Sequence, residues 1–226
     1  MADIGSLTFD LTDCTLGEQS ENHRFWMNTA RVAHLLRFNA KPVGWAFDLR
    51  MPDAAAAFYR QQCIDNGGVM LSMEVLKTGS IQMLSGLFKY RSPTPGSLGM
   101  YYVGILWLPF GDCNYQINIE AGESGTTGTR EAAVMIIEGD KWFSADAPVA
   151  EPVMLKDGED LFEKMRAAPL RVIPSDKADY DSTFPAHPLS LVRARLAEVA
   201  ATVGGDASLA SLKPFSVRRA WQFWKK

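Results

Sequence analysis

The feature that most constrains this fold is a tight reversal at Gly111-Asp112, between the apolar segment "MYYVGILWLPF" (100–110) and the alternating segment "CNYQINIE" (113–120). A Gly-X pair between two strand-like segments is a signal for a two-residue β-hairpin. The apolar segment is about half as long as a membrane-spanning helix and contains a glycine, which favours a strand over a span. We therefore expect two antiparallel strands joined by this turn.

The register of this hairpin separates two kinds of surface. Side chains alternate along a strand, so residues that pair across the ribbon share a face. One face is apolar, with Leu108 opposite Tyr115 and Leu106 opposite Ile117. The other face is mixed, with the pairs Trp107 and Gln116, Ile105 and Asn118, and Val103 and Glu120, and with Asn114 near the turn. Exposure of the apolar side chains of the mixed face to water would be unfavourable. We therefore expect another element to cover part of this face and to leave a row of polar side chains uncovered.

The remaining periodicities place helices on both sides of a strand-rich middle. Strand patterns cover 69–77 and 80–91, as a hairpin across Thr78-Gly79 with Val69, Leu71, Met73 and Val75 on one side. Helical patterns cover 53–66, 129–139, 158–168 and 189–203, the last ended by Gly204-Gly205. The segment before about residue 50 fits strand or helix.

This order predicts an α+β fold, an antiparallel meander of about four to six strands with helices packed on it, resembling an α/β/α sandwich. Apolar residues make up 47% of the chain, enough to form a core without disulfides or metals. We expect a single domain over 1–226. Within it, 40–145 form the core helix and sheet, and 146–226 form a C-terminal helical segment with a basic aromatic tail.

Charge and cysteine content disfavour several classes of protein. The net charge of −3 argues against nucleic-acid binding, and three cysteines without a CxxC motif suggest neither a disulfide framework nor a zinc ribbon. The N-terminus has no apolar signal segment, so we expect a cytoplasmic protein. Residues 213–226 carry five basic groups and no acid. We expect this tail to dock on the body or on a partner, with membrane contact through 214–226 as the alternative.

The sequence predicts no catalytic centre, no metal site and no cofactor. Zinc ligands usually come in close pairs, whereas the histidines are scattered at positions 23, 34 and 187. Cys113 falls on the apolar face of the hairpin, where a thiol packs as an inert side chain. Catalysis stays open, but these observations favour its absence.

The glycine-rich stretch "ESGTTGTREAA" (123–133) allows two interpretations. In the first, Thr127 or Thr129 caps a helix, and the glycines permit the turn that leads into it. In the second, the loop and Arg130 hold an anion at the helix N-terminus. The G-K-[ST] ending of a phosphate-binding loop is missing, so we favour the helix start.

The best candidate for recognition lies on the mixed face of the hairpin. It combines a polar row, formed by Asn114, Gln116, Asn118 and Glu120, with the neighbouring indole of Trp107. Donors and acceptors near an apolar wall are typical of a ligand pocket or a partner surface. A solvated side of the sheet is the plainer alternative.

The motifs "FKYR", "YYVGILWLPF", "SGTTGTREAA" and "FPAHPLSLVR" resemble those of a group of uncharacterised bacterial proteins, over about 45–200. In architecture, the helix, antiparallel sheet and "TGTREA" helix resemble the Mog1/PsbP-like α/β/α sandwich. That resemblance implies partner binding rather than catalysis, by analogy of fold alone.

We therefore expect a bacterial, non-catalytic binding or adaptor module with an unknown protein partner. The alternative is a small-molecule-binding protein or enzyme that uses Arg130 with Glu120 and Gln116. The sequence does not set the oligomeric state.

Overall fold

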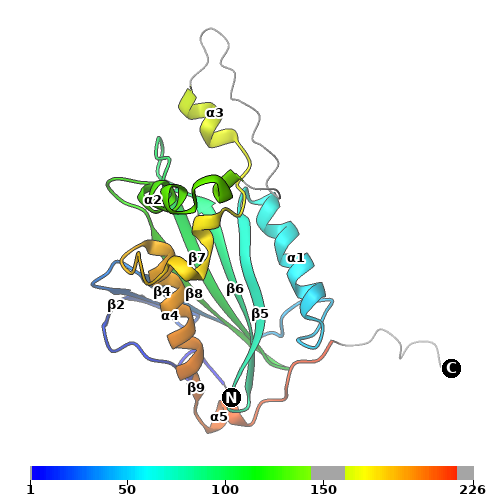
Figure 1. Cartoon of the computed structure of the whole chain (residues 1–226). Coiled ribbons are helices and arrows are strands. Elements are labelled where there is room, and N and C mark those ends of the chain that lie inside the picture. Colours follow the sequence, from blue (N-terminus) through cyan, green and yellow to red (C-terminus); the bar gives the residue numbers. More distant parts are fainter. Residues whose placement is uncertain (1, 144–160, 218–226) are drawn as a thin grey trace, which may run out of the picture.

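The computed structural model describes residues 2–143 and 161–217, and a seven-stranded antiparallel sheet forms its centre (Figure 1). The strand order is β2-β3-β4-β8-β7-β6-β5. Because consecutive strands pair for the most part, the sheet is close to a meander. Its strands are β2 (Cys14–Gln19), β3 (His23–Asn28), β4 (Ala33–Asn39), β5 (Val69–Thr78), β6 (Ile81–Arg91), β7 (Met100–Pro109) and β8 (Asn114–Gly122).

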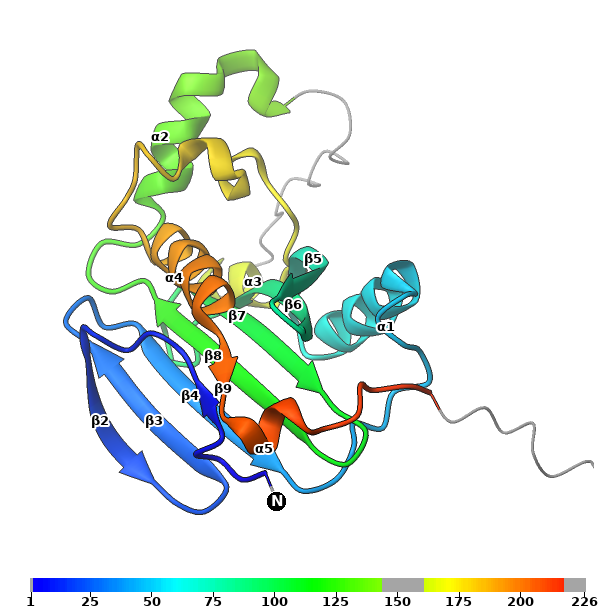
Figure 2. The same cartoon turned by 90° about the horizontal axis from the view of Figure 1, so that it is seen from below.

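Helices lie on both faces of this sheet, as Figures 1 and 2 show. Helix α4 (Pro188–Thr202) packs on β7 and β8, and its predicted apolar stripe is buried. Helix α1 (Pro52–Asp65) packs on β5 from the other side. The predicted α+β class with a sandwich-like arrangement is confirmed. The sheet is larger than expected, because the unassigned N-terminal segment supplies three strands.

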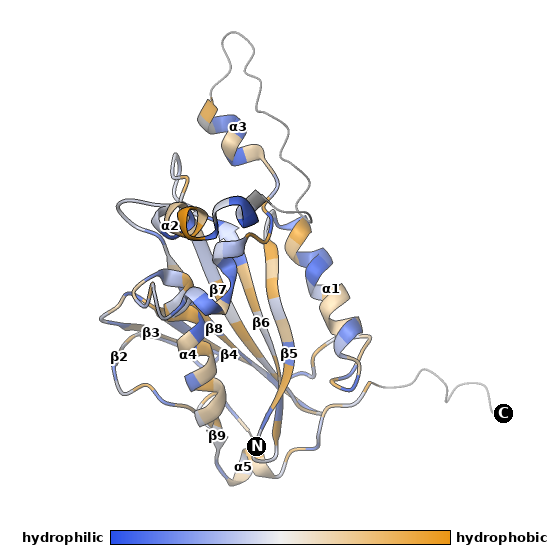
Figure 3. Ribbon diagram, in the orientation of Figure 1, coloured by the Kyte–Doolittle hydropathy of each residue, from blue (hydrophilic) through white to orange (hydrophobic). Residues whose placement is uncertain are grey.

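The turn at Gly111-Asp112 forms as predicted. Leu108 pairs with Tyr115 and Trp107 with Gln116, and the register continues to Glu120. The apolar face packs under α4, where Gly104 allows a close approach: a Cβ there would lie 3.1 Å from Leu196 Cδ1. Apolar residues follow the central strands in Figure 3.

The other hairpin differs from the prediction in two details. Thr78 pairs with Ile81, so the turn residues are Gly79 and Ser80, one position later than expected. A bulge between Met70 and Ser72 shifts the register of β5. As a result Leu71 packs against the α4-side core, whereas Met73 and Val75 pack against the α1-side core. The prediction that Val69, Leu71, Met73 and Val75 share one side was wrong, because the extra residue at the bulge inverts the alternation of side chains.

Shorter elements close the ends of the sheet. They are β1 (Leu7–Thr8), α2 (Thr129–Glu138), α3 (Leu161–Ala167), α5 (Ala207–Ala210), and the 3-10 helices η1 (Gly139–Phe143), η2 (Pro174–Asp176) and η3 (Ala178–Tyr180). The glycines that end α4 form β9 (Gly204–Gly205), which pairs with β1. Within the described ranges, no helix combines the length and apolar character needed to cross a membrane.

Candidate functional site

Three residues of the predicted polar row, Gln116, Asn118 and Glu120, are linked by hydrogen bonds along β8. Gln116 donates to Asn118 at 2.7 Å, and Asn118 donates to Glu120 at 2.9 Å. Tyr101 of β7 donates its hydroxyl to the other oxygen of Glu120 at 2.6 Å. Asn114 donates separately to the Lys41 carbonyl at 2.7 Å. The row is therefore held in place before any ligand arrives.

Helix α1 covers the row's aromatic neighbour. Trp107 is 8% exposed, and its ring stacks on Tyr59 with centroids 4.2 Å apart. The Tyr59 hydroxyl in turn accepts a hydrogen bond from Trp45 Nε1 at 2.9 Å. The α1-side core takes its strand residues from β5, β6 and β7. Trp107 thus belongs to a packed core and forms the edge of the row.

The other half of this sheet face carries no helix among the described residues (Figure 2). In the register, Leu35 lies opposite Asn118, Phe25 opposite Leu35, and Arg37 opposite Gln116. All are half-buried except Arg37, which is exposed. We name this surface the open sheet face and define it by Phe25, Leu35, Arg37, Gln116, Asn118 and Glu120.

A pocket of about 900 Å³ opens at one end of the open sheet face. Polar and charged side chains line much of it, among them Glu18, His23, Arg37, Lys41, Asn114 and Gln116. Its size falls within the usual range for small-ligand sites. The row that the sequence predicted therefore borders both an open surface and a hollow.

The structure places Arg130 away from this row. Its guanidinium is fully buried and donates to the Ser175 carbonyl (2.7 Å), Ser190 Oγ (2.6 Å), the Lys177 carbonyl (2.9 Å) and Asp181 Oδ1 (3.0 Å). These contacts join α2 to α4 and to the chain that leads into it. Glu120 instead faces the α1 side of the sheet, so the two charges do not meet in one site.

The glycine-rich loop is held by Glu123. Its carboxylate accepts hydrogen bonds from Gly128 N (3.0 Å), Met100 N (2.8 Å) and His187 Nε2 (3.4 Å). Burial alone would raise the pKa of Glu123, but these hydrogen bonds outweigh it and the pKa is lowered.

Helix α2 begins without the predicted threonine cap. Its N-cap is Gly128, at φ 73°, and no side chain caps it. Thr127 is half-buried beside Gly99, whose Cβ, if added, would lie 3.0 Å from Thr127 Cγ2. The loop does start a helix. The Glu123 carboxylate, rather than a threonine hydroxyl, accepts the hydrogen bond from the Gly128 N–H.

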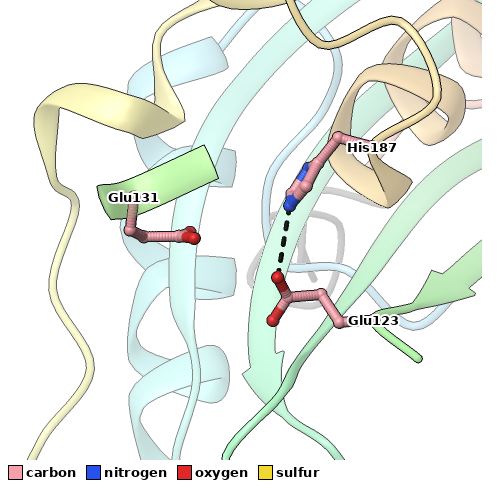
Figure 4. A group of neighbouring side chains, drawn as sticks. All are labelled: Glu123, Glu131 and His187. Atoms are coloured by element: carbon pink, nitrogen blue, oxygen red, sulfur yellow. Dashed lines mark hydrogen bonds and ion pairs between the residues drawn. The ribbon is translucent and has the colours of Figure 1, made fainter. Parts of the chain in front are cut away.

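Glu123 also gathers a cluster that the sequence did not predict (Figure 4). One ligand atom from each of Glu123, Glu131 and His187 lies within 4.8 Å of the others. Each residue sits in a quoted motif, "ESGTTGTREAA" or "FPAHPLS", but the motifs lie more than fifty positions apart in the chain. Only the fold brings them together.

A second unpredicted contact joins Cys14 and His34. The thiol Sγ lies 3.8 Å from His34 Nδ1, while Arg195 Nε donates to His34 Nε2 at 3.0 Å. Burial raises the pKa of the thiol and lowers the pKa of His34 to about 4. Both shifts favour the neutral forms, so this pair lacks an activated thiolate.

Solved structures that resemble this chain are distant from it in sequence, as two of them illustrate. The Ran-binding protein Mog1p of Saccharomyces cerevisiae matches with 12% identity and a TM-score of 0.47, over 91% of this chain and 93% of its own. A protein of Bacteroides thetaiotaomicron matches with 10% identity and a TM-score of 0.31, over 54% of this chain and 44% of its own. The first match agrees with the resemblance in architecture to the Mog1/PsbP-like sandwich. No protein-family model and no curated protein matches the chain.

Proposed function

We propose that this protein is a non-catalytic binding module that holds a protein partner against the open sheet face. One observation carries the proposal: α1 covers only one half of the sheet face on which the polar row lies. The other half keeps two half-buried apolar side chains, Phe25 and Leu35, beside fixed amides and a carboxylate. Apolar contacts bordered by polar groups are the usual composition of a protein interface.

The polar row is suited to recognition because its geometry is set in advance. Each side-chain amide has two N–H donors, and Gln116 and Asn118 each use one within the row. The second donors and the Gln116 carbonyl stay available to a partner. Side chains that are already ordered lose less conformational entropy on binding, which favours affinity.

Substitutions within the open sheet face test this proposal. Asn118→Arg places a long charged side chain at the centre of the row, and Leu35→Glu places a charge among the apolar residues. Gln61→Arg, on the exposed side of α1, is the matched control. Tagged full-length protein is used to capture partners from the producing cell, and the affinity of a recovered partner is then measured with purified components.

We expect the wild type and Gln61→Arg to bind the partner equally, and the two open-face variants to bind at least about tenfold more weakly, a loss of about 1.4 kcal/mol. A photo-crosslinking residue at position 35 should form an adduct with the partner. Equal affinity in all four proteins, without an adduct, would contradict the proposal. So would turnover in a broad hydrolase screen by a protein that captures no reproducible partner.

A small-molecule ligand is the second candidate, favoured by the pocket of about 900 Å³. Arg37 and Lys41 supply positive charge there, which suits an anionic ligand. A metabolite panel screened by thermal shift should then reveal a ligand whose stabilising effect is lost in Arg37→Ala. A full response in that variant would remove the pocket from consideration.

A further inference from the structure

Among the described residues, four buried side-chain oxygens have no hydrogen-bond partner: the Tyr102 hydroxyl, Glu131 Oε2, Ser175 Oγ and Asp176 Oδ1. Tyr102 lies on β7, Glu131 on α2, and Ser175 and Asp176 on η2, which packs against α2. Lys89 pairs with Tyr102 in the sheet and bonds Asp176 through its ammonium at 2.5 Å, which places η2 beside Tyr102. An unpaired buried polar atom costs about 1–3 kcal/mol, so four in one region indicate a bound polar species.

Glu123 and His187 complete this region. The Tyr102 ring meets His187 edge-on with centroids 5.5 Å apart, and Glu131 lies across from the pair formed by Glu123 and His187 (Figure 4). We name the region lined by Tyr102, Glu123, Glu131 and Asp176 the acidic chamber. Glu123 and His187 also line a pocket of about 450 Å³.

His187 is fixed as a hydrogen-bond donor to the chamber. Its Nδ1 accepts from the Leu189 N–H at 3.2 Å, where it caps α4, so the neutral ring carries its proton on Nε2. That N–H points at Glu123 Oε1. His187 therefore orients the carboxylate and does not offer a lone pair to a metal.

The acidic chamber holds more negative than positive charge. Asp176 is paired with Lys89, and the guanidinium of Arg130 bonds Asp181 and the Ser175 carbonyl at the border of the chamber, so three carboxylates face two cations that already have acidic partners. Glu131 adds a third carboxylate, and its Oε2 is buried without a hydrogen-bond partner. Glu123 accepts three hydrogen bonds, and a carboxylate offers about four lone pairs, so one is left. The unused groups are thus oxygens around an excess of negative charge.

We propose that the acidic chamber binds a divalent cation through oxygen ligands, with Glu131 Oε2 and Glu123 as the carboxylate ligands and His187 holding Glu123 in place. Calcium, magnesium and manganese prefer such ligands, whereas zinc and copper favour imidazole or thiolate. The Tyr102 hydroxyl and Asp176 Oδ1 bond directly to the ion or to its bound water.

The test uses the full chain stripped with a chelator and titrated with Ca²⁺, Mg²⁺ and Mn²⁺, by calorimetry and by thermal unfolding. We expect one site for at least one of these ions, and an increase in Tm of about 5–10 °C at one hundred times its Kd. Glu131→Gln keeps the shape and removes the charge, and we expect it to weaken binding at least about tenfold. Tyr102→Phe should weaken it by a smaller factor. Glu74→Gln, which removes an exposed carboxylate of β5, is the control and should bind as the wild type does.

Two results would overturn the proposal. If no ion binds or raises Tm, the chamber holds only ordered water, and Glu131→Gln will match the wild type in Tm. If an ion binds equally well to Glu131→Gln, its site lies elsewhere. Asn118→Arg should bind the ion normally, so failure at the open sheet face and failure at the acidic chamber are distinguished.

Discussion

Replacing Arg130 with methionine should destabilise the fold by about 3–5 kcal/mol, the range observed when one partner of a buried ionic network is removed. The substitution removes four hydrogen bonds at once. Two of the acceptors, on Ser175 and Ser190, belong to buried residues, and each buried acceptor left unpaired costs about 1–3 kcal/mol. Asp181 is 24% exposed and keeps Arg193 as a partner, so its share is smaller.

Urea unfolding followed by circular dichroism measures this loss at neutral pH. Arg60→Met, on the exposed side of α1, is the matched control and should change the free energy of unfolding by less than about 0.5 kcal/mol. If Arg130→Met unfolds at the wild-type urea concentration with an unchanged slope, the guanidinium does not anchor α2. The reasoning that gives Arg130 a structural rather than a ligand-binding role would then fail.

Two further substitutions test the packing around the sheet. His34 has its pKa lowered from 6.5 to about 4, first by burial, so between these values the unfolded chain binds a proton that the folded chain does not. Stability should therefore fall by about 3 kcal/mol as the pH drops through this window, and His34→Gln should lessen that fall in unfolding curves taken from pH 7 to pH 4. Gly104→Val adds a side chain whose Cβ would lie 3.1–3.2 Å from Leu196 and Val192 of α4, and should cost about 1–3 kcal/mol in urea unfolding. Gly44→Ala, with no neighbouring atom within 4 Å of its Cβ, is the control, and an equal loss in both would contradict the close packing of α4.

The hairpin of β7 and β8 was predictable because its determinants are local. A two-residue turn fixes the register, and the alternation of side chains then assigns every residue from Trp107 to Glu120 to a face. The helix α4 was predictable for the same kind of reason, since a stripe of apolar residues recurs at helical spacing and is buried, namely Leu189, Val192, Leu196 and Val199. The residues of the polar row were thus placed together correctly before the structure was known.

The candidate sites depended on contacts that no local pattern encodes. Nothing near Arg130 in the sequence indicates that its acceptors lie at positions 175, 177, 181 and 190. The histidine that orients Glu123 is likewise distant, at position 187. The scattered histidines argue against a zinc site only. A site built from oxygen ligands does not require paired histidines.

The sequence by itself determined the elements whose signals lie within a few residues: the turn at Gly111-Asp112, the alternation of side chains along β7 and β8, and the apolar stripe of α4. The tertiary structure alone decided which surfaces stay open and which charges are buried. It added β2, β3 and β4 to the sheet, left their α1 side uncovered by any described helix, and buried the guanidinium of Arg130. The physical reason is that turns and periodicity follow from backbone geometry, whereas burial depends on which distant segments meet.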